Sequence, residues 1–137
     1  MHRAVVTTDP LDVAEHAALV DAPAAGAVVT FAGVVRDHDH GRAVLGLEYS
    51  GHPTAGDVLA RVVAEVVADL EVDAVAVSHR LGALAIGDVA LAVAVSAAHR
   101  GQAFEACSRL VDEVKAQLPV WKHQAFDDGT SEWVACP

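Results

Sequence analysis

The stretch VALAVAVSAAHRGQAFEACSRLVDEVKAQLPVWK, residues 89–122, contains the two clearest structural patterns of the chain. Residues 89–97 alternate valine or leucine with alanine, which predicts a strand buried on both faces with its small face against a close neighbour. Residues 101–118 repeat apolar positions every three or four residues, which predicts a helix that ends at Pro119. The core-facing stripe of that helix is expected at Phe104, Cys107, Val111, Val114 and Leu118.

The segments on either side predict more strands and helices without strict alternation. Asp9 and Pro10 are typical of a helix start, with Asp9 as the N-cap of a helix that runs to about residue 21. Gly33 is expected to form a bulge, residues 37–41 (DHDHG) a polar loop, and residues 127–129 (DDG) a hairpin turn. This order favours one α+β domain over residues 1–137, with a largely antiparallel sheet. Strands are expected at residues 2–8, 27–36, 44–49, 74–78, 120–126 and 132–135, and a second helix after residue 51.

Composition and charge narrow the classes of partner. The 137 residues are 53% hydrophobic, which is enough for a core built mainly from alanine and valine. The net charge of −10 argues against nucleic acid or an anionic membrane as partner. The longest uncharged stretch, residues 22–35, is too short and too interrupted to span a bilayer, and no signal-peptide core follows the N-terminus. We therefore expect a cytoplasmic protein.

The two cysteines do not indicate a disulfide framework or a nucleophile. Cys107 falls within the predicted helix and is typical of a small core residue. Cys136 lies one residue from the end of the chain, and a bond between the two remains an open alternative.

The only two lysines, Lys115 and Lys122, flank Pro119. The chain is expected to reverse between them, so both amines could meet in one cleft. Amines suit proton transfer because their pKa responds to burial and to neighbouring charge. The simpler interpretation is that Lys115 pairs with Asp112 near the helix C-terminus and that Lys122 is solvated, and spacing alone favours it.

Other polar residues suggest further sites. His99 and Arg100 stand where a buried strand meets a helix N-terminus, an arrangement that suits an anion, although they could merely end the strand. Arg36 ends another strand, either at a rim or within a cleft. His38 and His40 alternate with aspartates in a pattern that can bind zinc, but a solvated loop is the preferred interpretation, so no metal is expected.

Taken in order, several segments resemble the large, catalytic subunit of molybdopterin synthase, the MoaE family. The resemblance extends over residues 27–133, and it is specific because the segments come in the family's order and include the two lysines around Pro-Val-Trp. The segments are FAGVVRDH (31–38), LEY (47–49), HRLG (79–82), GD (87–88), SAAHR (96–100), AFE (103–105) and KAQLPVWK (115–122).

This resemblance implies a hammerhead-type α+β fold and a sulfurtransferase of molybdenum cofactor biosynthesis that has no cofactor of its own. Two large subunits form a homodimer, and each binds one small, ubiquitin-like, MoaD-like subunit, which gives a heterotetramer. The Gly-Gly tail of the small subunit ends in a thiocarboxylate. Two sulfurs pass in sequence to cyclic pyranopterin monophosphate and form the dithiolene of molybdopterin.

The resemblance also implies roles for individual residues. Lys115 is expected to hold or polarise the thiocarboxylate, and Lys122 to act on the pterin as acid, base or charge stabiliser. Substrate-binding residues are expected at Phe31, Arg36, His99 and Arg100, the last two across the dimer interface. Two alternatives are a non-catalytic docking module for a ubiquitin-like sulfur carrier, and a metal-binding protein that uses His38 and His40.

Overall fold

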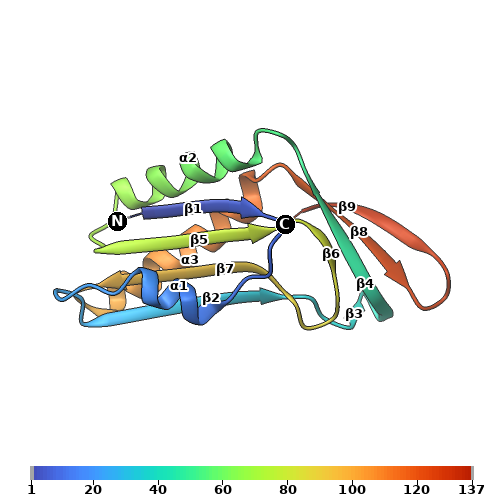
Figure 1. The fold of residues 1–137 in the computed structure, drawn as a ribbon, viewed down its shortest axis with the longest axis horizontal. Helices are drawn as coiled ribbons and strands as arrows, with labels where there is room; N and C mark the ends of the chain where they lie inside the picture. The colour runs from blue at the N-terminus through green and yellow to red at the C-terminus, as the bar shows by residue number, and fades with distance from the viewer. Residues whose placement is uncertain (1, 137) are drawn as a thin grey trace.

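Two sheets organise the chain in the computed structural model, which describes residues 2–136 (Figure 1). A four-stranded sheet has the order β1-β5-β7-β2, and a five-stranded sheet has the order β3-β4-β8-β9 with β6 paired to β4. All strand pairs are antiparallel except β1 with β5. The elements are β1 (His2–Thr7), α1 (Val13–Leu19), β2 (Ala27–Val34), β3 (His38–Asp39), β4 (Arg42–Gly51), α2 (Ala55–Ala68), β5 (Ala74–Arg80), β6 (Gly82–Leu84), β7 (Val89–Ala97), α3 (Arg100–Gln117), β8 (Val120–Phe126) and β9 (Ser131–Cys136).

Helices cover both faces of the four-stranded sheet. The large residues of β5 and β7 pack against α2 and α3 in the main core, which includes Leu59, Val93 and Leu110. The alanines on the opposite face, such as Ala94, pack beneath Val20 at the end of α1. The prediction of a strand buried on both faces is therefore confirmed, and the close neighbour of its small face is α1.

The predicted stripe of α3 is partly wrong. Phe104 is 60% exposed, whereas Ala103, Ala106 and Leu110 are fully buried. The helix rests on its alanine side because small side chains let its backbone approach the sheet closely. Cys107 is a buried free thiol, so it forms no disulfide.

Two local predictions also need correction. The N-cap of α1 is Asp12 rather than Asp9, because the Asp12 side chain accepts hydrogen bonds from the backbone N–H groups of Ala14 and Glu15. Residues 37–41 are not simply a loop, since β3 pairs with β4 through a turn in which His40 has a φ of 50°. The bulge at Gly33 and the 127–129 turn between β8 and β9 are confirmed.

The two sheets meet where β2, β5 and α3 each continue into the five-stranded sheet. In Figure 1, β4 and β8 run steeply across the ends of the four strands. The chain passes from β2 to β3, from β5 to β6 and from α3 to β8 at this junction. Residues at the ends of distant segments are thereby brought together. Within the described residues, no helix has the length and apolar character needed to cross a membrane.

Candidate functional site

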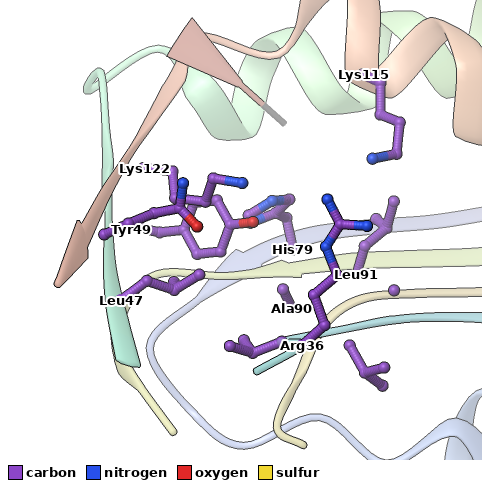
Figure 2. A pocket seen from close by; sticks show the side chains of 12 residues that line it. Arg36, Leu47, Tyr49, His79, Ala90, Leu91, Lys115 and Lys122 are labelled. Atoms are coloured by element: carbon purple, nitrogen blue, oxygen red, sulfur yellow. The ribbon is translucent and has the colours of Figure 1, made fainter. Parts of the chain in front are cut away.

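A pocket of about 340 Å³ lies at the junction of the two sheets (Figure 2). Its walls come from the end of β2, from β4, β5, β7 and β8, and from the last turn of α3. The lining residues are Gly33, Val34, Val35, Arg36, Leu47, Tyr49, His79, Ala90, Leu91, Lys115, Lys122 and Gln124.

The lining contains three cations and no carboxylate. Lys115 of α3, Lys122 of β8 and Arg36, just after β2, enter the same space, as Figure 2 shows. The chain as a whole has 19 acidic residues against 9 lysines and arginines. Three cations gathered in one lining favour negative charge in the pocket, although the protein as a whole is acidic. The arrangement suits a small anionic ligand.

Strand alternation explains how Lys122 reaches the pocket. In β8, Val120, Gln124 and Phe126 are buried, while Trp121 is 40% exposed. Because side chains alternate across a strand, Lys122 shares the inward face with the buried residues. The sequence prediction that Lys122 faces away from Trp121 is consistent with this placement.

The other lysine comes from the end of α3. Lys115 follows the fully buried Val114, in the last turn before the chain bends at Pro119 and enters β8. The structure therefore brings Lys115 and Lys122 to one pocket, as the expected chain reversal suggested. Their chemical roles remain predictions.

A hydrogen-bonded chain of side chains holds Arg36. Arg36 Nη2 donates to Asp39 Oδ1 at 3.1 Å, and Gln124 Nε2 donates to Asp39 Oδ2 at 2.7 Å. Gln124 also donates to Glu132 Oε1 at 3.2 Å. The hydrogen bond from Gln124, followed by the positive charges of His40, Lys122 and Arg36, lowers the pKa of Asp39 despite burial.

His79 is a buried imidazole in the wall of the pocket. It is 1% exposed, and its ring meets that of Tyr49 edge to face, with 4.9 Å between centroids. Its Nδ1 lies 2.9 Å from the carbonyl oxygen of Arg80 and donates to it. Burial, together with the nearby charge of Lys115, lowers the pKa of His79 to about 4, so the ring is neutral near pH 7.

Neutrality makes His79 a hydrogen-bond acceptor. With the proton on Nδ1, Nε2 carries a lone pair that can accept a hydrogen bond. In the sequence, His79 appeared only within the HRLG segment (79–82) of the family resemblance. Its position at the end of a predicted buried strand was the only feature of the sequence that could have indicated a pocket residue.

Three expected site residues lie elsewhere in the chain. Phe31 lines a separate groove with Phe104 and Cys107. His99 and Arg100 stand at the start of α3, and Lys115 fifteen residues later is roughly 22 Å away along the helix axis. One chain therefore does not bring His99 and Arg100 to the pocket, and the cross-dimer role that the resemblance implies remains a prediction.

The histidines of the 37–41 segment make surface contacts. His38 pairs with Asp37 at 3.0 Å, and His40 lies 3.6 Å from Asp39. Among residues 2–136, no three His, Cys, Asp or Glu side chains are grouped so as to hold a metal ion. The segment instead supplies Asp39, which holds Arg36.

Comparison with protein families and curated sequences gives consistent matches. The family model described as MoaE protein matches residues 6–117. A molybdopterin synthase catalytic subunit from Nostoc sp. is 36% identical over 135 residues, covering 95% of this chain and 80% of the relative. The catalytic subunit from Arabidopsis thaliana is 37% identical over 120 residues, and the match spans 87% of this chain but only 61% of that relative.

Solved structures share the fold. Molybdopterin synthase from Staphylococcus aureus aligns with a TM-score of 0.89 and 30% identity, covering 98% of each chain. A complex of subunits 1 and 2 of molybdopterin-converting factor from Helicobacter pylori aligns with a TM-score of 0.71, covering 98% of this chain and 88% of that one. At 20% identity the second likeness shows the fold alone. The expected α+β class is confirmed.

Proposed function

The chain belongs to the MoaE protein family, and from this premise we propose that it is the catalytic subunit of a molybdopterin synthase. It would transfer sulfur from the thiocarboxylated tail of a small ubiquitin-like subunit to cyclic pyranopterin monophosphate. The described chain would act as one domain in the cytoplasm, as a homodimer within a heterotetramer.

One observation carries this proposal: the pocket gathers three cations in a chain of net charge −10. Both proposed reactants are anionic, one through its phosphate and the other through its thiocarboxylate. Cations that are fixed in a partly enclosed site interact with such charges more strongly than exposed ones. The sulfur arrives on the partner, so the reaction needs no cysteine of this chain, in agreement with the burial of Cys107.

Each lysine has a distinct proposed task. Lys115 holds the thiocarboxylate, whose sulfur forms a bond to a carbon of the pterin substrate. The carbon–oxygen bond at that carbon breaks, and its oxygen leaves. Lys122 exchanges a proton with the pterin or stabilises its developing charge. The carbon–sulfur bond of the tail is then broken by water, which leaves a carboxylate on the small subunit. Arg36 binds substrate at the mouth of the same pocket.

The remaining expected residues belong to the dimer part of the proposal. His99 and Arg100 would come from the second copy, because their own helix separates them from Lys115. Phe31 would contribute to substrate binding only if its groove joins the pocket in the assembled dimer, since the two are separate within one chain.

Reconstitution tests the function directly. The purified chain is mixed with thiocarboxylated small subunit and cyclic pyranopterin monophosphate, and the dithiolene product is read as its fluorescent oxidation derivative. The same small subunit ending in an ordinary carboxylate is the control. We expect product only with the thiocarboxylate. Stable binding of the small subunit without product would favour the docking-module alternative.

A further inference from the structure

We propose that Asp39 is a positioning residue that fixes Arg36 in the pocket and that Gln124 holds Asp39 in place for this task. The inference rests on the proposed function, because it takes Arg36 as a residue that binds an anionic substrate. It also gives the DHDHG segment a purpose other than metal binding.

Arg36 requires such a support. It lies just after β2 ends, and its side chain is 66% exposed. A free arginine side chain loses roughly 2 kcal/mol of rotamer entropy when it is fixed, which weakens any ligand that must order it. The bond to Asp39 orders the guanidinium before the ligand arrives. It uses one of five N–H donors, so the others remain for an anion.

Asp39 is itself held through both of its carboxylate oxygens. It is 8% exposed, and both carboxylate oxygens accept hydrogen bonds, Oδ1 from Arg36 and Oδ2 from Gln124. Gln124 is 3% exposed and lies in β8 between β4 and β9. A carboxylate held at both oxygens by a buried amide and an arginine has a defined orientation, which it imposes on the arginine.

Alternation along β3 explains why the aspartate faces inward. Asp39 pairs with Arg42 and His38 pairs with Ala43 across the β3–β4 ladder. His38 and His40 are exposed on either side of the buried Asp39. Neither histidine lines the pocket: His38 contacts Asp37, and His40 lies 3.6 Å from Asp39 Oδ1. The Asp39 carboxylate meets Gln124 and Arg36.

Asp39→Asn tests the proposal, with Asp37→Asn as a matched control. Both variants replace a carboxylate by an amide of nearly the same size, two residues apart. The side chain of Asp37 is 78% exposed and contacts His38 rather than the pocket. Calorimetric titration of the full chain with cyclic pyranopterin monophosphate gives the dissociation constant of each variant. The same titration is made for Arg36→Ala and for Arg36→Ala combined with Asp39→Asn.

We expect Asp39→Asn to weaken binding roughly fivefold to tenfold and Asp37→Asn to change it less than about twofold. In the Arg36→Ala background, Asp39→Asn is expected to add nothing, because its effect acts through Arg36. A purely structural role would weaken binding by the same factor in both backgrounds and would overturn the proposal. Equal dissociation constants for Asp39→Asn and the wild type would also overturn it.

Gln124→Met is a second variant in case Asp39→Asn does not fold. It removes the donor to Asp39 and is expected to weaken binding in the same direction, again only when Arg36 is present. A wild-type chain that binds the pterin but makes no product with thiocarboxylated partner would contradict the proposed function. The binding comparison between variants would still decide the role of Asp39.

Discussion

Different interactions stabilise each of the two sheets of this chain. The four-stranded sheet packs its valines, leucines and alanines against the helices, and Val93 of β7 and Leu110 of α3 are fully buried in this core. In the five-stranded sheet, β8 places Lys122 and Gln124 on its inward face, and Gln124 bonds to the buried Asp39. Apolar packing supplies a rigid platform, and the polar site is built at its edge from hydrogen bonds and charges.

This difference predicts two kinds of variant. Changes in the apolar core are expected to lower the free energy of unfolding while the molecules that remain folded keep their activity. Changes to the half-buried or exposed cations of the polar site are expected to lower activity or binding with little effect on unfolding. A variant that violates this separation would show that the two regions are not independent.

Among the variants expected to keep some activity or to change stability alone, the largest expected effect belongs to Lys122→Ala. Loss of a group that transfers a proton or stabilises charge typically reduces the rate by about 10²–10⁴-fold, so we expect a fall of that size in kcat. The melting temperature should hardly change, because Lys122 is only half-buried. Single-turnover product formation measures the rate. Arg61→Ala, on the exposed face of α2, is the control, and an unchanged kcat for Lys122→Ala would remove its proposed role.

Leu110→Ala is the corresponding change in the core. Leu110 is fully buried between α3 and the sheet, so truncation is expected to lower the free energy of unfolding by about 2–5 kcal/mol. Denaturant titration measures this loss. Ser108→Ala, exposed on the same helix, should change stability by less than about 0.5 kcal/mol. If Leu110→Ala has a lower kcat than the wild type at temperatures well below its melting temperature, the apolar core and the polar site are not independent.

His79 connects the two regions, and its effect depends on pH. The pKa of His79 is about 4 in the folded chain, against an ordinary value of 6.5. Well above pH 6.5, the His79 imidazole is therefore neutral in both the folded and the unfolded chain. As the pH falls from about 6.5 to 4, only the unfolded chain takes up the proton, and the free energy of unfolding drops by up to roughly 3 kcal/mol.

His79→Gln is expected to lack this pH dependence. The measurement is the free energy of unfolding of both proteins at several pH values between about 4 and 7.5, across the window set by the two pKa values. Subtracting the two curves removes the contribution of other titrating groups. Parallel curves would mean that His79 is not held neutral in the fold.

The smallest expected effect concerns the cap of α1. Asp12→Ala removes the acceptor for two backbone N–H groups and is expected to lower the free energy of unfolding by about 1 kcal/mol. Asp9→Ala, at the position that the sequence suggested, is expected to lower it by less than about 0.5 kcal/mol. Thermal melts of the two variants make the comparison. A larger loss of unfolding free energy for Asp9→Ala than for Asp12→Ala would mean that Asp9, not Asp12, caps α1.

Sequence patterns predicted the four-stranded sheet and its helices better than the five-stranded sheet that carries the polar site. The alternation in β7 and the three-and-four spacing of α3 are repeated signals, and they placed both elements within one residue of their ends. The strands β3 and β6 have two and three residues, too few to show any period. Phe104 was misplaced because size was taken as a guide to burial, whereas close packing selected the alanines.

The family resemblance identified the three cations of the pocket, but it did not identify Asp39 and Gln124, which hold Arg36 in place. Lys115, Lys122 and Arg36 share a lining, while Phe31, His99 and Arg100 lie outside it within one chain. The bond between Asp39 and Gln124 joins positions 85 residues apart, and no local pattern signals such a contact. The resemblance to the MoaE family and the catalytic-subunit function it implied are confirmed by the comparisons.

The measurement that tests the central claim most directly is reconstitution with Lys115→Ala beside the wild type. Both chains are mixed with thiocarboxylated small subunit and cyclic pyranopterin monophosphate, and dithiolene product is followed with time. We predict product from the wild type, and none above background from a Lys115→Ala chain that melts normally and still binds the small subunit. Product at the wild-type rate from Lys115→Ala would contradict the assignment of the pocket as the site of sulfur transfer.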